Sequence, residues 1–196
     1  MRTTRLEAFS DGVLAIIITI MVLELHAPAE ASYDALGNIA NSLLTYLLSF
    51  VYIGIYWNNH HHMLQVVERV NGAVLWANLH LLFWLSLMPL WTAWMQESDF
   101  GRAPTVIYGV NLLAAAIAYY ILQLSIVRVE GPDSRLQRAI GTDKKGKLSP
   151  VLYLIGIALS AVASPWAGLA VYTMVAIIWL VPDRRMERLV QASEGG

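Results

Sequence analysis

The apolar residues of this chain are gathered into helix-length blocks that are separated by short polar segments. Residues 12–23, for example, contain only Gly, Ala, Thr, Met and branched aliphatic side chains. Hydrophobic residues make up 57% of the 196 residues and charged residues 14%, whereas a soluble domain carries about 25% charged residues. An apolar helix of about 20 residues is long enough to span a bilayer. The chain is therefore predicted to be an all-α integral membrane protein.

Six membrane-spanning helices are expected in one domain that covers residues 1–196. Their approximate spans are 4–26, 36–57, 73–95, 105–129, 148–163 and 166–182. The second span is expected to continue into the polar run 58–68, and Pro89 is expected to kink the third. The last two spans form a hairpin and are shorter than the roughly 20 residues that cross a bilayer. Either the fifth helix begins before Pro150, or this pair lies shallowly in the membrane.

Basic residues gather on one side of this predicted topology. Of the 13 Lys and Arg residues, all except Arg102 fall at the termini or in the connections that six spans place on the same side. The segment 130–148 is the longest polar stretch and is expected to be a basic cytoplasmic loop. Short loops rich in Lys and Arg stay in the cytoplasm. We therefore expect a multi-pass protein of the cell membrane with both termini in the cytoplasm.

The first span begins with a polar motif, Arg5-x-x-x-Phe9-Ser10-Asp11-Gly12. An acid at the mouth of an apolar helix is costly, so it requires a partner or a function. On a helical wheel of about 100° per residue, one face carries Ile16, Thr19, Ile20 and Leu23. Asp11 points about 140° away from Ile16 on the same wheel. The helix therefore presents two surfaces, an aliphatic stripe with one hydroxyl group and a corner that contains the acid.

This motif, followed by Ile16 and Thr19, resembles the first helix of the bacterial relatives of the lysosomal potassium channel, a family marked by its Phe-Ser-Asp motif. Further matches lie in the second and third helices, at Trp57-x-x-His60, Asn78 and Pro89. The resemblance covers about half of the chain, and the last three helices match in hydropathy alone. It implies a homotetramer in which the first helix of each subunit lines the pore, with Ile16 at its narrow point.

A group of polar residues is expected to meet beside this helix. Its members are Arg5, Ser10, Asp11, Trp57, His60 and Asn78. In a low dielectric a charge must be paired or must change its protonation state. The group could be a clasp that joins the first three helices of one subunit, or it could coordinate ions directly. We favour the clasp, because Asp11 lies on the wrong side of the helix to line the same pore as Ile16.

The aliphatic stripe also has two interpretations. Aliphatic side chains on one face of a membrane helix usually contact lipid or another helix, and a threonine hydroxyl often bonds a carbonyl group of the preceding turn. The family resemblance favours a pore, whose expected constriction and selectivity residues are Ile16, Thr19, Ile20 and Leu23. An apolar gap strips water from ions and penalises sodium more than potassium, because sodium holds its water more tightly. The sequence has no Thr-Val-Gly-Tyr-Gly carbonyl filter.

The remaining features give no sign of an enzyme, a cofactor or a metal site. The neighbours His60, His61 and His62 point about 100° apart on a helix and cannot converge on one metal. The chain has no cysteine, and its net charge of −1 gives no sign of nucleic-acid binding. His80 is expected to make a hydrogen bond in helix packing.

The predicted function is a potassium-selective leak channel that uses a hydrophobic constriction. One alternative is a proton-permeable channel of the same fold. The other is a secondary ion transporter, although the sequence shows neither the internal repeat nor the interrupted helices that many transporters have.

Overall fold

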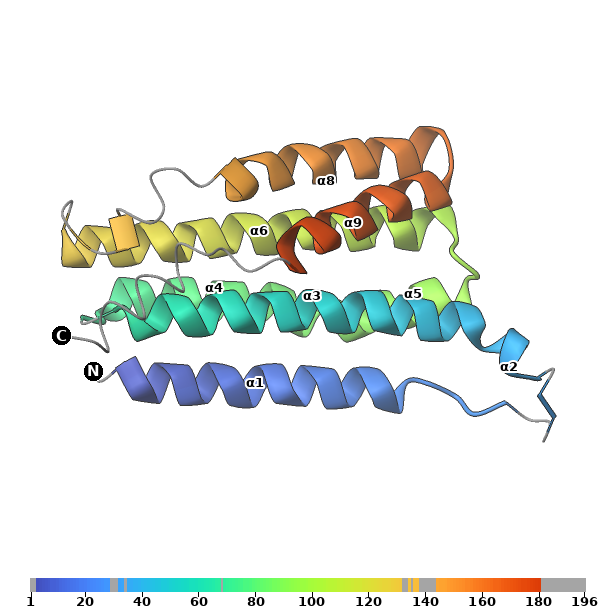
Figure 1. The fold of residues 1–196 in the computed structure, drawn as a ribbon, viewed down its shortest axis with the longest axis horizontal. Coiled ribbons are helices and arrows are strands. Elements are labelled where there is room, and N and C mark those ends of the chain that lie inside the picture. The colour runs from blue at the N-terminus through green and yellow to red at the C-terminus, as the bar shows by residue number, and fades with distance from the viewer. Residues whose placement is uncertain are drawn as a thin grey trace.

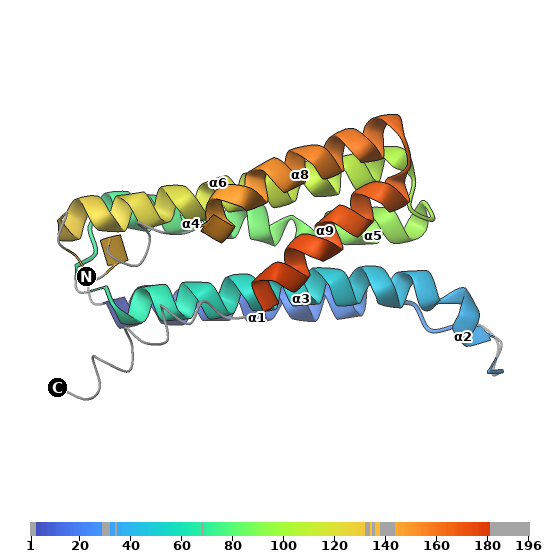
Figure 2. The ribbon, with the colours of Figure 1, turned by 45° about the horizontal axis from the view of Figure 1, so that its top comes forward.

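The computed structural model describes residues 3–28, 32–33, 35–67, 69–131, 134, 136–137 and 144–180, and these form a helical bundle (Figures 1 and 2). In chain order the helices are α1 (Thr3–Leu23), α2 (Ala35–Asn38), α3 (Ala40–Gln65), α4 (Gly72–Ser86), α5 (Met88–Glu97), α6 (Arg102–Glu130), α8 (Lys144–Val162) and α9 (Pro165–Leu180). Most of them lie along one axis, and α9 crosses the bundle obliquely (Figure 2). No strand occurs in the described ranges, and the all-α prediction is confirmed.

The architecture has six long helical segments among the described residues. Five of them are long and apolar enough to cross a membrane, namely Thr3–Leu23, Ala40–Gln65, Gly72–Glu97, Arg102–Glu130 and Lys145–Val162. The third of these segments combines α4 and α5. The sixth, α9, is a shorter apolar helix of 16 residues, which corresponds to about 24 Å at 1.5 Å per residue.

Several helix boundaries differ from the predicted spans. The second span is divided, because the short α2 precedes α3, which then continues through the polar run to Gln65. The fifth helix begins at Lys144, before Pro150, so the first of the two alternatives is correct. Because α8 begins there, the connection after α6 is shorter than the predicted basic loop 130–148. Residues 138–143 and 181–182 lie outside the described part of the chain.

Pro89 accounts for the break between α4 and α5. α4 ends at Ser86, and Pro89 occupies the first turn of α5. Proline has no amide hydrogen, and its ring collides with the carbonyl group four residues earlier, here that of Leu85. The predicted kink is therefore present, and α1 packs against the helices on both sides of it.

Two glycines allow α6, α8 and α9 to pack closely. A Cβ atom on Gly109 of α6 would collide with the hydroxyl group of Tyr172, and one on Gly168 of α9 would collide with the side chain of Ser160. Tyr172 and Ser160 are both fully buried. Small residues at such positions let membrane helices approach each other closely. These three helices therefore form a tightly packed half of the bundle.

Two basic side chains bind the carbonyl ends of neighbouring helices. The guanidinium group of Arg102 donates to the carbonyl oxygen of Ala161 near the end of α8, at 3.0 Å. The ammonium group of Lys145 donates to the carbonyl oxygen of Ile178 near the end of α9, also at 3.0 Å. The last carbonyl groups of a helix lack partners within it and carry partial negative charge. Arg102, the single basic residue on its side of the predicted topology, therefore has a structural role.

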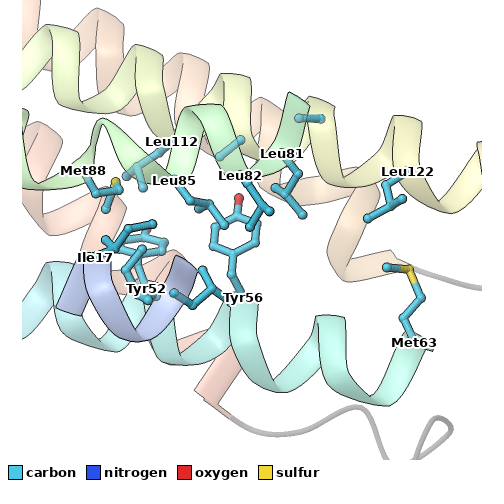
Figure 3. Packing of buried hydrophobic residues seen from close by; sticks show 14 of the residues in the cluster. Ile17, Tyr52, Tyr56, Met63, Leu81, Leu82, Leu85, Met88, Leu112 and Leu122 are labelled. Carbon is cyan, nitrogen blue, oxygen red and sulfur yellow. The ribbon is translucent and has the colours of Figure 1, made fainter. Parts of the chain in front are cut away.

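α1 lies at the edge of the bundle and contacts α3, α4 and α5 (Figure 1). Its buried residues recur every three or four positions, as expected for one face of a helix, and they are Leu6, Ser10, Leu14, Ile17 and Met21. Figure 3 shows Ile17 in the same apolar core as Tyr52 of α3 and Met88 of α5. One face of α1 is thus fixed against the bundle, and the opposite face points outward.

The close packing around Tyr172 predicts the effect of one added methyl group. Gly109→Ala is expected to lower the unfolding free energy by about 1–3 kcal/mol, the usual cost of overpacking a core. Thermal unfolding of the purified protein in detergent should show a lower midpoint for this variant. The matched control is Gly72→Ala, since a Cβ atom there meets no atom within 4 Å. An unchanged midpoint for Gly109→Ala would contradict this close packing of α6 against Tyr172.

Candidate functional site

The outward face of α1 carries the four residues of the predicted stripe. Ile16 is 58% exposed, Ile20 42% and Leu23 78%, and Thr19 is exposed between them. Within the described subunit nothing covers this face, whereas the opposite face of the same helix lies in the core. The structure therefore places the four side chains on one surface. Their role as a constriction remains a prediction.

The hydroxyl group of Thr19 has a defined orientation on this face. It donates a hydrogen bond to the carbonyl oxygen of Ile16, with a distance of 2.8 Å between the two oxygens. The hydroxyl hydrogen is thus occupied, while the lone pairs of the oxygen remain as acceptors. An oxygen in this state can accept a hydrogen bond from water or contact a cation.

A buried chain of hydrogen bonds joins α1, α4 and α3. The amide nitrogen of Asn78 donates to Oγ of Ser10 at 2.9 Å, and this hydroxyl donates to the carbonyl oxygen of Leu6 at 2.9 Å. On its other side, Oδ1 of Asn78 lies 2.7 Å from Nε2 of His60, so the imidazole donates there. Ser10, Asn78 and His60 are all at most 1% exposed. The chain is therefore a clasp of three helices that is shielded from solvent.

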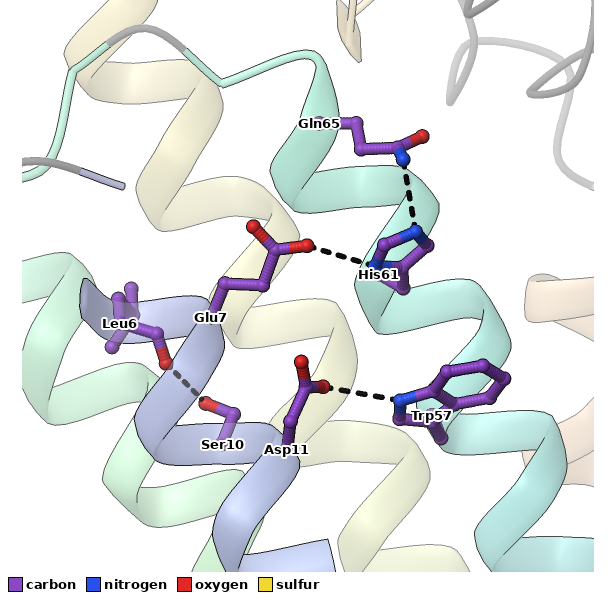
Figure 4. Close-up of polar contacts among 7 residues, drawn as sticks. All are labelled: Leu6, Glu7, Ser10, Asp11, Trp57, His61 and Gln65. Atoms are coloured by element: carbon purple, nitrogen blue, oxygen red, sulfur yellow. Dashed lines mark hydrogen bonds and ion pairs between the residues drawn. The ribbon is translucent and has the colours of Figure 1, made fainter. Parts of the chain in front are cut away.

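Two half-exposed contacts join α1 to α3 beside this buried clasp (Figure 4). The indole nitrogen of Trp57 donates to Oδ1 of Asp11 at 3.1 Å. One turn towards the start of α1, Oε1 of Glu7 lies 2.8 Å from Nδ1 of His61. The other ring nitrogen of His61 lies 2.9 Å from Nε2 of Gln65. Both acids of the first turns of α1 are therefore directed at α3.

The structure does not bring all six residues of the predicted polar group together. Arg5 is exposed and bonds to none of the described residues, because it lies eleven residues before Ile16 and about 20° from it around the helix. His60 binds Asn78 and not Asp11. The expectation that all six residues meet is therefore wrong within one subunit, because Arg5 lies apart and Asp11 contacts Trp57. Asp11 and Trp57 do meet, and so do Ser10, Asn78 and His60.

The contact between Glu7 and His61 was not predicted from the sequence, although spacing could have indicated it. Glu7 lies four residues before Asp11, and His61 lies four residues after Trp57, so each pair shares a helix face. On antiparallel helices, a contact between Asp11 and Trp57 brings Glu7 and His61 together one turn away. His80 also differs from expectation, since it accepts a hydrogen bond from Trp84 of its own helix at 3.0 Å.

No cluster of three or more His, Asp or Glu side chains in the described ranges could hold a metal ion. The arrangement offers an outward aliphatic face with one oriented hydroxyl group, backed by polar contacts to two helices. Such a surface can contact a second helix, lipid or a passing ion.

Comparison with known proteins gives a consistent result for the whole chain. The profile of the family described as endosomal/lysosomal potassium channel TMEM175 matches residues 5–89, which include all of the predicted site residues. A potassium channel of Chryseobacterium sp. (strain P1-3) is 54% identical over 184 residues, covering 94% of this chain and 95% of that protein.

A solved structure extends the similarity to the fold. The crystal structure of a lysosomal potassium-selective channel TMEM175 homologue from Chamaesiphon minutus superposes with a TM-score of 0.79 at 32% identity, covering 91% of this chain and 96% of that one. The endosomal/lysosomal proton channel TMEM175 of Mus musculus is 31% identical over 112 residues, which are 51% of this chain and 22% of that protein.

Because the clasp is buried and the contacts of Glu7 and Asp11 are half-exposed, two substitutions should change the unfolding free energy by unequal amounts. Asn78→Ala should lower the unfolding free energy by about 1–3 kcal/mol, because both Ser10 and His60 lose a buried partner. Asp11→Asn keeps an oxygen for Trp57 at a half-exposed position, and we expect it to cost less than about 1 kcal/mol. Thermal unfolding of the purified variants measures both. Equal losses would contradict this division.

Proposed function

The chain belongs to the endosomal/lysosomal potassium channel (TMEM175) family, and on this basis we propose that it is a potassium-selective leak channel with a hydrophobic constriction. As a member of a channel family, the chain is not an enzyme, and the relatives compared above are named as channels and not as transporters. The observation that carries the proposal is the aliphatic face of α1 that the rest of the described subunit leaves uncovered.

An uncovered stripe of this kind suits a symmetric assembly. The four side chains of one stripe can line only one side of a channel, so a single subunit cannot enclose an ion path with α1. Four copies around an axis would place four stripes face to face and cover them. The proposed active form is therefore a homotetramer in which each subunit contributes α1 to the pore.

The charge distribution supports an orientation for this assembly. The N-terminal end of α1 lies at the same end of the bundle as the C-terminal end of α6 (Figure 1). Arg5, Arg128 and Lys145 belong to this end, whereas Arg102 belongs to the other and binds a helix terminus there. By the positive-inside rule, the end with Arg5 faces the cytoplasm. The proposed location is the cell membrane, with both termini in the cytoplasm.

Selectivity in this proposal comes from partial dehydration. The distance from Ile16 to Leu23 along α1 is about 10 Å at 1.5 Å per residue, which is enough for aliphatic rings with a hydroxyl layer between them. Ile16 forms the narrow point, where an ion loses water without compensation. Thr19 follows one turn later with its oxygen lone pairs free to replace part of the lost water. A difference of about 1.4 kcal/mol between sodium and potassium gives tenfold selectivity.

A second candidate function is proton permeation in the same pore, and one observation favours it. The Mus musculus relative, which is 31% identical over 112 residues, is named a proton channel. In planar bilayers with equal potassium on both sides, a pH gradient should shift the reversal potential if protons permeate. A reversal potential that stays at zero under this gradient would exclude a substantial proton current.

The constriction predicts the outcome of Ile16→Asn. The amide keeps much of the side-chain volume but offers oxygen to a partly dehydrated cation, which helps sodium more than potassium. We expect the ratio of potassium to sodium permeability to fall by several-fold, up to about tenfold, while the total current holds or rises. Reversal potentials in bilayers with potassium opposed to sodium measure this ratio.

The control for this variant is Val22→Asn, about 120° from Ile16 around the helix, which should leave the ratio unchanged. Native mass spectrometry in mild detergent should show that both variants are tetramers. An unchanged permeability ratio in tetrameric Ile16→Asn would show that the stripe is a packing surface. A wild-type protein that is monomeric under these conditions would overturn the pore proposal.

A further inference from the structure

An apolar groove lies between α3 and α9. Its volume is about 610 Å³, which is within the range of about 300–1,000 Å³ that ligand sites occupy. The first half of α3 forms one wall, from Leu44 to Val51, and α9 forms the other, from Trp166 to Leu180. Phe100 also lines the groove, and its ring packs on that of Trp166 with centroids 4.4 Å apart. None of the residues that line the groove is charged.

The two helices that form this groove diverge towards one end of the bundle. The last turn of α9 lies close to α3, and the first turn of α9, at Pro165, lies farther from it (Figures 1 and 2). The groove is therefore a wedge, with its wide end at Phe100 and Trp166. A helix is about 10–12 Å across with its side chains and cannot enter the narrow end, where α3 and α9 are in contact. A single hydrocarbon chain can follow the wedge.

The length and polarity of the groove suit such a chain. On α3 the wall begins one turn after the first residue, Ala40, and runs from Leu44 to Val51, which is about 10.5 Å at 1.5 Å per residue. The hydrocarbon of one leaflet is about 15 Å deep. The hydroxyl group of Thr45 donates to the carbonyl oxygen of Asn41 at 2.8 Å and so needs no partner in the groove. The groove can therefore hold most of one acyl chain.

A positive charge lies beside the wide end. Arg102 follows Phe100 by two residues and is exposed. Its bond to the carbonyl oxygen of Ala161, near the turn from α8 into α9, uses one of the five N–H groups of the guanidinium. Asp99 does not neutralise this charge, because its Oδ1 accepts from Nδ2 of Asn41 at 2.9 Å and it makes no ion pair with Arg102. The other guanidinium donors can bind a phosphate group.

We propose that this groove binds one acyl chain of an anionic phospholipid whose phosphate group contacts Arg102. The lipid belongs to the leaflet at the wide end, where Arg102 is the single basic residue of the predicted topology. A zwitterionic phospholipid fits less well, because its cationic amine is repelled by the guanidinium. The inference goes beyond the proposed function and does not depend on a pore, since it needs only this bundle in a bilayer.

A second subunit suits the groove less well than a lipid does. α9 packs against α3, α6 and α8, and it belongs to the tightly packed half of the bundle. In the proposed tetramer α1 faces the axis, so α9 lies on the side of the subunit away from the axis. A partner helix would also leave the narrow end of the wedge empty, whereas a flexible chain fills it.

The headgroup contact is tested by native mass spectrometry. The protein is stripped of lipid in detergent and titrated with palmitoyl-oleoyl phosphatidylglycerol or with the matching phosphatidylcholine. Arg102→Gln should weaken the binding of one phosphatidylglycerol per subunit by about fivefold, the effect of one basic residue at a membrane surface, and should change phosphatidylcholine binding little. Arg102→Lys keeps the charge and should retain most of the affinity. Thermal unfolding checks that the variants are folded.

The chain contact is tested by filling the groove. Ala170 lines the groove at an exposed position of α9, and Ala170→Trp should remove one bound lipid per subunit with either headgroup. The matched control is Ala158→Trp, at an exposed position of α8 outside the groove and at a similar distance from the turn between α8 and α9. This control should bind lipid as wild type does.

A double variant shows whether the two contacts hold the same lipid. Arg102→Gln combined with Ala170→Trp should lose no more phosphatidylglycerol than Ala170→Trp alone, because coupled sites do not act additively. Arg128→Gln, at the other end of α6, should act independently of Ala170→Trp.

Three results would overturn the inference. Additive losses from Arg102→Gln and Ala170→Trp would mean that the charge and the groove bind different lipids. Equal losses from Ala158→Trp and Ala170→Trp would mean that the groove is not the site. A lower proportion of tetramers in Ala170→Trp, with an unchanged number of bound lipids, would show that a second subunit covers the groove.

Discussion

Three buried polar side chains hold α1 in place, and the rest of the site depends on them. Asn78 of α4 bonds Ser10 of α1 and His60 of α3, and all three are almost completely shielded from solvent. A polar group inside a membrane protein cannot turn to water when it loses its partner, so each of these bonds is costly to break. Because Ser10 must face α4, the rotation of α1 about its own axis is fixed.

Because this rotation is fixed, it determines which side chains of α1 are buried and which are exposed. The side next to Ser10 enters the apolar core, and the far side exposes Ile16 and Leu23 where the subunit has nothing to cover them. Between these sides, Glu7 and Asp11 are directed at α3. α6, α8 and α9 form the tightly packed half of the bundle, and α1 packs against the other half. The helix proposed to line the pore is thus held by a few polar bonds and one apolar face.

Local patterns in the sequence were sufficient to predict much of this arrangement. The helix-length apolar blocks predicted six helical segments, Pro89 predicted the break before α5, and the wheel placed Ile16 and Thr19 on one face. The partners of the polar side chains on α1 were harder to predict. Arg5 was expected to join the polar group, yet it is exposed, and the contact between Glu7 and His61 was not foreseen. Pairing across helices depends on the register of α1 against α3, which no local pattern contains.

The sequence by itself determined that this chain is a membrane protein of helices and that its first helix has an apolar face and an acidic one. It did so because hydrophobic periodicity and proline act within a few residues along the chain. Only the tertiary structure decided that His60 is buried against Asn78 while His61 meets Glu7 at a half-exposed position. Adjacent residues on a helix point about 100° apart, so the neighbouring helices determine which of the two histidines is enclosed.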